Sequence, residues 1–146
     1  MSIVDLIREE PVDRLRTSVG KLPQIDAQTQ HTIAGGMYAR TIMIPKGSVI
    51  VGLEHLKDHI NVMSGDITVT TGEGVKRFTG GHIVIDCKAG HARSGYAHED
   101  TYWTTFVRTD EIDLEAIENE SVKHPEMLQT RTLKLTEENR TWLGQQ

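Results

Sequence analysis

Two histidines, His55 and His59, stand four residues apart in "GLEHLKDHINVMSGD", with Asp58 between them. Residues i and i+4 of a regular strand share a face, so the two imidazoles would point the same way. Two imidazoles and a carboxylate are suitable ligands for Zn²⁺, Fe²⁺, Mn²⁺ or Ni²⁺. A fourth ligand would come from a later histidine: His82, His91 or His98. The alternative is a polar turn that binds no metal.

Aromatic residues gather farther along the chain, and the cluster includes Tyr96, His98, Tyr102 and Trp103. Alternate residues of a strand face opposite sides, so one face would pack in the core and the other would line a cavity or an interface. Core packing is the commoner use of aromatic residues, and ligand binding by Tyr96, His98 and Trp103 is the alternative. The single cysteine, Cys87, fits a buried inert thiol better than a nucleophile.

Size and charge restrict the class of protein. A chain of 146 residues is expected to form one domain with its own core. Its formal net charge of −5 argues against a nucleic-acid or membrane surface held by bulk charge. One cysteine allows no internal disulfide, which favours a reducing compartment. The N-terminus lacks the pattern of a signal peptide, and no segment has the apolar length of a membrane span.

The first region, residues 1–34, is expected to be helical and then extended. The apolar residues of "SIVDLIRE" recur at helical spacing, and Ser2 can cap that helix. Pro11 ends or restarts it. Residues 12–33 are polar and weakly periodic, which predicts a short helix followed by an extended arm.

The middle region, residues 35–109, is expected to be all β. Strand-like segments with glycine turns recur about every ten residues, which is typical of an antiparallel sandwich or barrel. Within "HINVMSGDITVTT" we predict a turn at Ser64-Gly65, and in "TGEGVKRF" a hairpin at Gly72 and Gly74. The segment "GGHIVIDCKAG" is expected to be a strand bounded by glycines, and "DTYWTTFVRT" has the strongest β composition.

The last region, residues 110–146, is expected to form a helical tail. A helix would start at Thr109 or Asp110 as its cap. Its apolar stripe would consist of Ile112, Leu114 and Ile117. The segment "TLKL" is expected to be a short strand, and "TEENRTWLGQQ" a last helical turn.

The middle region resembles the cupin superfamily. That family's pattern has a glycine, a His-x-His pair, an acid and a glycine, and then a second block with Pro-x-Gly and a final histidine. Here Gly47 opens the first block, and Asp58 stands seven residues before Gly65, at the place of the family's glutamate. The segment "GGHIVIDCKAGHAR" resembles the second block, which opens at Gly80 or Gly81. The resemblance covers residues 35–108 and implies a double-stranded β-helix, the cupin-type jelly-roll barrel.

The match departs from the family at the metal ligands. The paired histidines would fall near Gly52 and Glu54, where this chain has His55 as its nearest histidine. The proline of the second block is Lys88, and the final histidine is Arg93. The His-His-Glu-His set is therefore absent position by position.

Arg93 changes the chemistry expected at the barrel mouth, because an arginine there repels a metal ion instead of binding it. A guanidinium suits a carboxylate or phosphate that it can hold with two hydrogen bonds. The alternative is an internal ion pair with Asp58 or Glu99. Both alternatives remain open at this point.

The chain is also similar to small cupin-like proteins that bacteriophages encode. Four blocks carry this similarity in order: Tyr38 to Gly47, Gly52 to Gly65, Ala89 to Ala97, and Glu99 to Thr105. The similarity implies a phage source and a cupin fold more than an activity.

Together these observations predict an all-β cupin-type barrel with short helical or extended arms at both ends. Because such arms often wrap a neighbouring subunit, we expect a homo-oligomer. Our first hypothesis is a phage-encoded, non-catalytic protein of the host cytoplasm or the virion, with a role in assembly with virion proteins or in binding a small anionic ligand. The alternative is a metal-dependent isomerase or dioxygenase that uses His55, Asp58, His59 and Arg93.

Overall fold

The computed structural model describes residues 2–9, 11–22, 24, 26–71 and 74–132. The helices are α1 (Ile3–Glu9), α2 (Val12–Gly20), α3 (Leu114–Ser121) and the 3₁₀ turn η1 (Pro125–Met127). The strands are β1 (Gln30–Ala34), β2 (Met37–Ile44), β3 (Val49–Val51), β4 (His59–Thr71), β5 (Gly74–Cys87), β6 (Ser94–Ala97) and β7 (Thr101–Arg108). Within the described part, no helix is long and apolar enough to cross a membrane.

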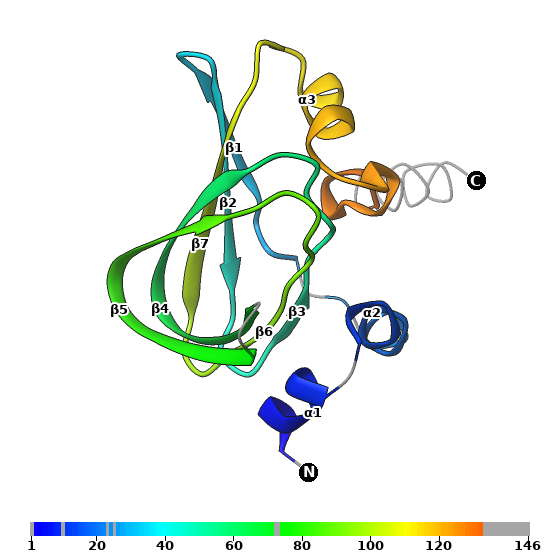
Figure 1. The fold of residues 1–146 in the computed structure, drawn as a ribbon, viewed down its shortest axis with the longest axis vertical. Helices are drawn as coiled ribbons and strands as arrows, with labels where there is room; N and C mark the ends of the chain where they lie inside the picture. Colours follow the sequence, from blue (N-terminus) through cyan, green and yellow to red (C-terminus); the bar gives the residue numbers. More distant parts are fainter. Residues whose placement is uncertain (1, 10, 23, 25, 72–73, 133–146) are drawn as a thin grey trace, which may run out of the picture.

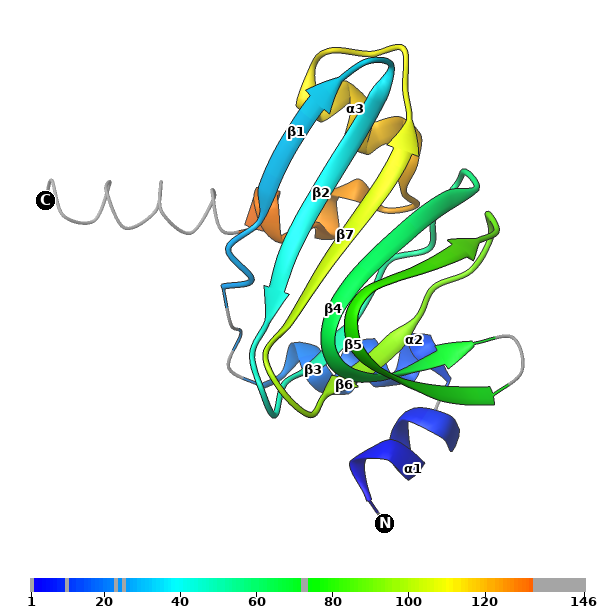
Figure 2. The same cartoon turned by 90° about the vertical axis from the view of Figure 1, so that its left-hand side faces the viewer.

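The seven strands form one antiparallel sheet in the order β1-β2-β7-β4-β6-β3, with β5 beside β4. The first half of β4 pairs with β7 and its second half with β6, so the sheet curls along this strand. The helices lie on the concave side (Figure 1), and the convex side faces the viewer in Figure 2. The predicted fold class is confirmed as a mostly β, curled half-barrel with few short helices.

The turn predicted at Ser64-Gly65 is wrong, because β4 continues through both residues with a bulge. Gly65 has a φ of +145°, and a Cβ atom there would lie 2.7 Å from the backbone oxygen of Asp100. The glycine therefore allows β7 to approach β4 closely and bends the strand, as bulge glycines do. Likewise β5 runs through Gly80 and Gly81, which do not bound it as predicted.

Several strand boundaries differ from those expected. The sheet begins with β1, which lies in the predicted extended arm and pairs with β2 across Gly35 and Gly36. Strand β6 was not predicted as a separate element. The hairpin between β4 and β5 is confirmed by the pairing of Thr71 with Gly74, whereas Gly72 lies outside the described residues.

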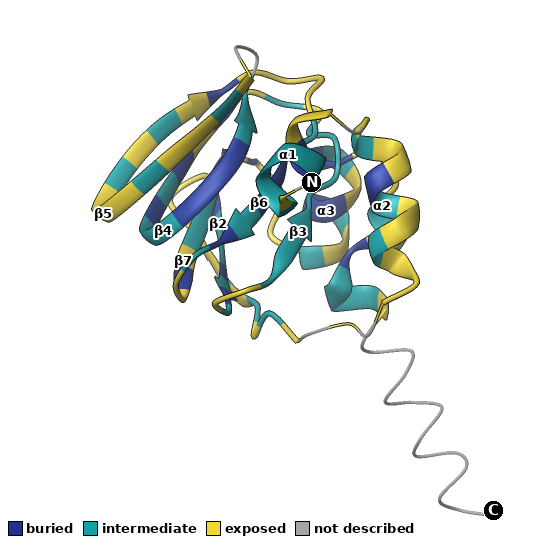
Figure 3. Cartoon of the chain, turned by 90° about the horizontal axis from the view of Figure 1, so that it is seen from below, coloured by how far each residue is buried: buried dark blue, intermediate teal, exposed yellow. Residues whose placement is uncertain are grey.

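The buried residues lie on the concave side of the curled sheet (Figure 3). The larger cluster of buried residues consists of Ile42, Ile44, Met63, Ile67, Val69 and Ala97. A second cluster joins Tyr38 of β2, Val107 of β7 and Ile117 of α3. This second cluster packs α3 against β2 and β7. Helix α3 thereby covers a polar part of the concave face.

The N-terminal helices pack on the chain's own sheet. Ser2 caps α1 as predicted, because its Oγ accepts a hydrogen bond from the Asp5 N–H at 3.1 Å. Ile7 of α1 and Leu15 of α2 are 1% and 3% exposed. Each of these two helices therefore buries at least one apolar residue within the chain itself.

The start of α3 was predicted wrongly. Its cap is Asp113, whose Oδ2 accepts a hydrogen bond from the Ala116 N–H at 3.1 Å, and neither Thr109 nor Asp110 takes this role. Ile112 precedes the cap and is 87% exposed, so it is not part of the apolar stripe. The predicted strand "TLKL" and the turn "TEENRTWLGQQ" fall on residues 132–146, and these lie outside the described part apart from residue 132.

Candidate functional site

A row of polar side chains crosses the concave face near α3. Arg40 of β2 is the cross-strand partner of Thr105 of β7, which is the partner of Asn61 of β4. The Thr105 hydroxyl donates to Asn61 Oδ1 at 2.8 Å, and Asn61 Nδ2 donates to Cys87 Sγ at 3.0 Å. Four neighbouring strands thus present polar atoms to the inside of the half-barrel.

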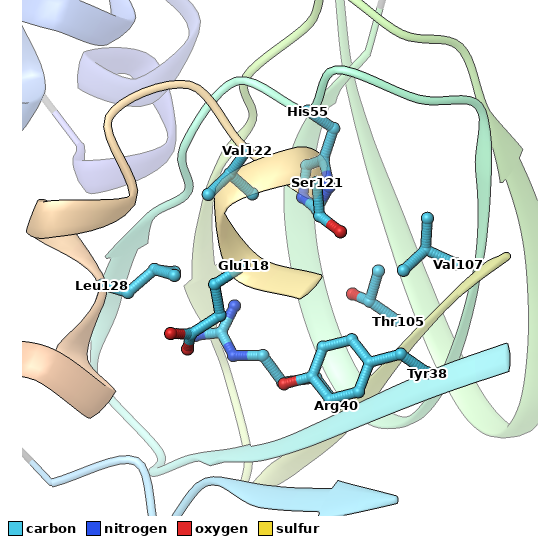
Figure 4. A pocket seen from close by; sticks show the side chains of 9 residues that line it. All are labelled: Tyr38, Arg40, His55, Thr105, Val107, Glu118, Ser121, Val122 and Leu128. Carbon is cyan, nitrogen blue, oxygen red and sulfur yellow. The ribbon is translucent and has the colours of Figure 1, made fainter. Parts of the chain in front are cut away.

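Helix α3 closes a small pocket over this row (Figure 4). The cavity volume is about 20 Å³, which is room for about one water molecule. The lining residues are Tyr38, Arg40, His55, Thr105, Val107, Glu118, Ser121, Val122 and Leu128. Three of them bury a polar atom that has no hydrogen-bond partner, namely Arg40 Nε, Glu118 Oε2 and Ser121 Oγ. Buried orphan atoms of this kind point to a bound water or ligand.

The loop between β3 and β4 forms one wall of the pocket. Its Leu56 N–H donates to the Ser121 carbonyl at 2.8 Å, and the Lys123 N–H donates to the Glu54 carbonyl at 2.8 Å. A β-bridge also joins His55 to Val122. These backbone contacts fix the end of α3 and hold the His55 ring at the pocket.

His55 and His59 come together as a stacked pair, with ring centroids 4.0 Å apart and planes at 26°. Burial, the neighbouring His59 and the charges of Arg40 and Arg93 lower the pKa of His55 to about 3. Burial also lowers the pKa of His59, with a smaller effect from Arg93 and an opposing hydrogen bond to the Lys57 carbonyl at 3.0 Å. Both imidazoles are therefore neutral at pH 7.

The two arginines near this pair have no carboxylate partner in ion-pair contact within the described part of the chain. The partners expected for Arg93 are engaged elsewhere, because Asp58 pairs with Lys88 at 3.6 Å and Glu99 with Lys46 at 3.4 Å. Burial lowers the pKa of Arg40, with smaller opposing effects from Tyr38 and Glu118.

The only buried carboxylate described in the pocket lining belongs to Glu118, which is 4% exposed. Its Oε1 accepts a hydrogen bond from Arg131 Nε at 3.1 Å. Arg131 thus neutralises Glu118, and the charges of Arg40 and Arg93 leave this part of the concave face positive.

The predicted metal ligands do not converge. The Asp58 carboxylate accepts the Ala89 N–H at 2.8 Å, pairs with Lys88, and is 66% exposed. The His55 and His59 ring planes meet at 26°, and two arginine charges act on His55. Within residues 2–9, 11–22, 24, 26–71 and 74–132, no three His, Cys, Asp or Glu side chains are grouped to hold a metal ion. In the described residues, His55 and His59 therefore lack the carboxylate that the sequence predicted as their third ligand.

The aromatic candidates lie apart from the pocket lining. Trp103 packs against the larger apolar cluster. Tyr96 pairs with Thr68 on β4, on the opposite face from the buried Ala97, and its ring meets His98 edge-on at 5.1 Å. His98 Nε2 lies 2.7 Å from the Thr68 hydroxyl. Of the four predicted ligand-binding residues, only Arg93 acts on the histidine pair.

Sequence analysis missed Arg40 and Glu118. In β2, Tyr38, Ile42 and Ile44 share the buried face, and Arg40 stands between them at the same parity. A charged residue in an otherwise apolar strand face is a signal that the pattern contained. Glu118 follows Leu114 by four residues, which places it on the inner side of α3.

No protein-family model matches the chain, and no curated protein matches it in sequence. Solved structures of similar fold include a cupin superfamily protein from Desulfitobacterium hafniense, at 10% identity over 61% of this chain and 84% of that one, with a TM-score of 0.48. A cupin-2 domain containing protein from Shewanella frigidimarina has 7% identity over 64% and 91%, with a TM-score of 0.46. Salicylate 1,2-dioxygenase from Pseudoaminobacter salicylatoxidans has 9% identity over 64% and 28%, with a TM-score of 0.49.

Proposed function

We propose that this chain is a binding module that holds a small anionic group, a carboxylate or a phosphate, at the positive part of its concave face. The observation that carries the proposal is Arg40, whose buried Nε has no hydrogen-bond partner, together with Arg93; neither has a carboxylate in ion-pair contact in the described part. Arg40 and Arg93 are half-buried, and a half-buried guanidinium without a partner is costly. An anion held by two hydrogen bonds would compensate it.

The pocket limits what can bind without movement. Its cavity of about 20 Å³ has room for about one water molecule, so a carboxylate or phosphate group would bind only if α3 shifts. The orphan Nε of Arg40 is a hydrogen-bond donor that an anion can use. Neutral His55 can donate a hydrogen bond from one ring nitrogen. Because its pKa is low, the imidazole adds no positive charge that would repel the two arginines.

A thermal-unfolding titration with inorganic phosphate and with acetate tests the proposal, with chloride at matched ionic strength as reference. A ligand that binds only the folded chain raises the melting temperature as its concentration rises. We expect this rise to be lost in Arg93→Gln and in Arg40→Met. Arg108→Gln is the matched control, because Arg108 is 84% exposed and pairs with Asp110. An equal response to all three anions would refute the proposal.

A metal-dependent enzyme that uses His55, Asp58, His59 and Arg93 is the second candidate, and it has less support because Asp58 is engaged by Ala89 and Lys88. Elemental analysis of protein purified without a tag tests it. About one metal ion per chain, lost in His55→Ala, would favour this candidate over anion binding. The phage source and a role among virion proteins rest on the sequence resemblance and remain predictions.

A further inference from the structure

In the described part of the chain, no helix covers the convex face of the sheet (Figure 2), and this face carries an apolar surface. Cross-strand pairing puts side chains of β2, β7, β4 and β5 on it together, and the Thr41 and Thr104 hydroxyls meet there at 2.8 Å. We call this surface the convex patch; its residues are Met37, Ala39, Thr41, Met43, Ile60, Val62, Val84, Tyr102, Thr104 and Phe106.

The convex patch is uncharged and partly well exposed. Val84 is 63% exposed, Tyr102 58% and Ile60 47%. The open face of an antiparallel sheet is normally polar, and contiguous apolar surface on a soluble protein commonly marks an interaction site. Two charged residues border the patch on the same face: Asp86 of the edge strand β5 is the cross-strand partner of Ile60, and Arg108 at the end of β7 is the partner of Met37.

We infer that the convex patch binds a second copy of this chain. A symmetric dimer brings one patch onto itself, so any charge near its centre would face a like charge or be buried. The patch has no charged residue, which removes that cost for self-association. A partner protein with charges of its own would find nothing on this patch to pair with them, and this favours a second copy as the occupant.

The size of the patch sets the strength expected. The four strands are spaced about 4.8 Å apart, and each contributes about six residues with a rise of about 3.3 Å per residue. The patch therefore covers roughly 400 Å² per copy. Two copies would bury less than the roughly 1,600 Å² of a standard stable interface. We therefore expect a weak dimer whose population depends on protein concentration. The N-terminal helices α1 and α2 contact β3, β4, β5 and β6 of their own chain.

Light scattering and sedimentation of the full chain, from low micromolar to several hundred micromolar, test the inference. The wild-type chain is expected to approach the mass of a dimer at high concentration. Val84→Arg and Tyr102→Arg place a charge in the patch and are expected to raise the dimer dissociation constant at least about tenfold. Ile112→Arg is the control, because Ile112 is 87% exposed and lies outside the sheet.

Far-UV circular dichroism establishes that each variant keeps its fold, and the exposure of both patch residues makes this the expected result. A wild-type chain that stays monomeric at every concentration overturns the inference. So does a dimer that survives either patch variant, or one that Ile112→Arg disrupts equally. If Val84→Arg does not fold, Tyr102→Arg alone decides between these outcomes.

Discussion

On the same four strands, the concave face holds Arg40 and Asn61 in one row, whereas the convex face holds Val62 and Val84 in the next. An antiparallel sheet with one solvated face usually has apolar residues inside and polar residues outside. Here this arrangement is reversed near α3. We propose different tasks for these two neighbouring rows, ligand binding for the polar inside and self-association for the apolar outside.

The reversed polarity of the two faces is local. The largest loss of stability is expected from a substitution in the apolar part of the concave face, next to the polar row. Met63 follows Asn61 on the concave face, is 1% exposed and belongs to the larger apolar cluster. We expect Met63→Ala to lower the free energy of unfolding by about 3 kcal/mol through the cavity that it leaves. Val84→Ala on the convex face should cost less than about 0.5 kcal/mol, because Val84 is 63% exposed. Urea unfolding at low protein concentration measures both.

The same pair of variants connects stability with self-association. If Val84→Ala costs more than about 1 kcal/mol at low concentration, the convex patch is covered by the chain itself and the comparison of the two faces fails. If Val84→Ala lowers stability only at high protein concentration, a second copy of the chain covers Val84.

Acid is expected to have the next largest effect, and it acts on the concave face. The pKa of His55 is lowered to about 3 in the folded chain, so below pH 6.5 the unfolded chain binds more protons than the folded one. The stability from neutral His55 is therefore complete above pH 6.5 and is lost as the pH falls toward 3. Between pH 6.5 and 5 we expect a loss of about 2 kcal/mol.

Urea unfolding of the wild-type chain and of His55→Gln at the two pH values measures this loss. Glutamine does not titrate, so the variant should lose less stability over the same interval. The carboxylates that have lowered pKa values, such as Asp66 and Glu120, titrate below this interval and leave it to the histidines. An unchanged pH dependence in His55→Gln would show that His55 is solvated in the folded chain.

Two adjacent threonines give a smaller contrast between the faces. Thr105 donates to buried Asn61 on the concave face, so Thr105→Val should cost about 1–2 kcal/mol by leaving Asn61 Oδ1 without a partner. Thr104 meets Thr41 on the convex face, where solvent can replace the lost contact, so Thr104→Val should cost less than about 0.5 kcal/mol. Equal costs in chemical denaturation would mean that the two faces are equally shielded from water.

The architecture was predictable from the sequence because alternation, β-formers and glycine spacing act locally. Strands β2 and β7 were recognised in this way, as was the β4–β5 hairpin. The sequence misled at Gly65, where a glycine that suggested a turn instead permits close approach of β7. A turn glycine and a bulge glycine differ in their distant neighbours, and these are absent from local sequence.

The candidate site was less predictable, because tertiary contacts decide it. The sequence placed His55, His59 and Arg93 in one candidate site, and the structure brings the two histidines together, but Asp58 bonds to Ala89 on a segment far along the chain. No local pattern announces that contact. Arg40 could have been found from its parity within β2, whereas its lack of a partner follows only from the position of α3.

The last prediction concerns Arg40 on the concave face, where a small change in the free energy of unfolding can separate a role in binding from a role in stability. Arg40 is buried with its Nε unpaired, and Glu118 keeps Arg131 as its partner. Replacing Arg40 by methionine removes a poorly compensated charge and fills the same space with apolar atoms. We therefore expect Arg40→Met, without added anion, to raise the free energy of unfolding by roughly 1 kcal/mol. Arg131→Met should lower it, because it leaves Glu118 buried without a cation.

Chemical denaturation of both variants, with and without phosphate, measures this contrast. A site kept for binding is expected to cost stability when empty, so Arg40→Met should be more stable than wild type in buffer and lose that advantage when phosphate stabilises the wild type. If Arg40→Met is destabilised as much as Arg131→Met, Arg40 serves mainly to neutralise Glu118. The polar row would then be a structural network, and the reversed polarity of the sheet would be explained by α3 alone.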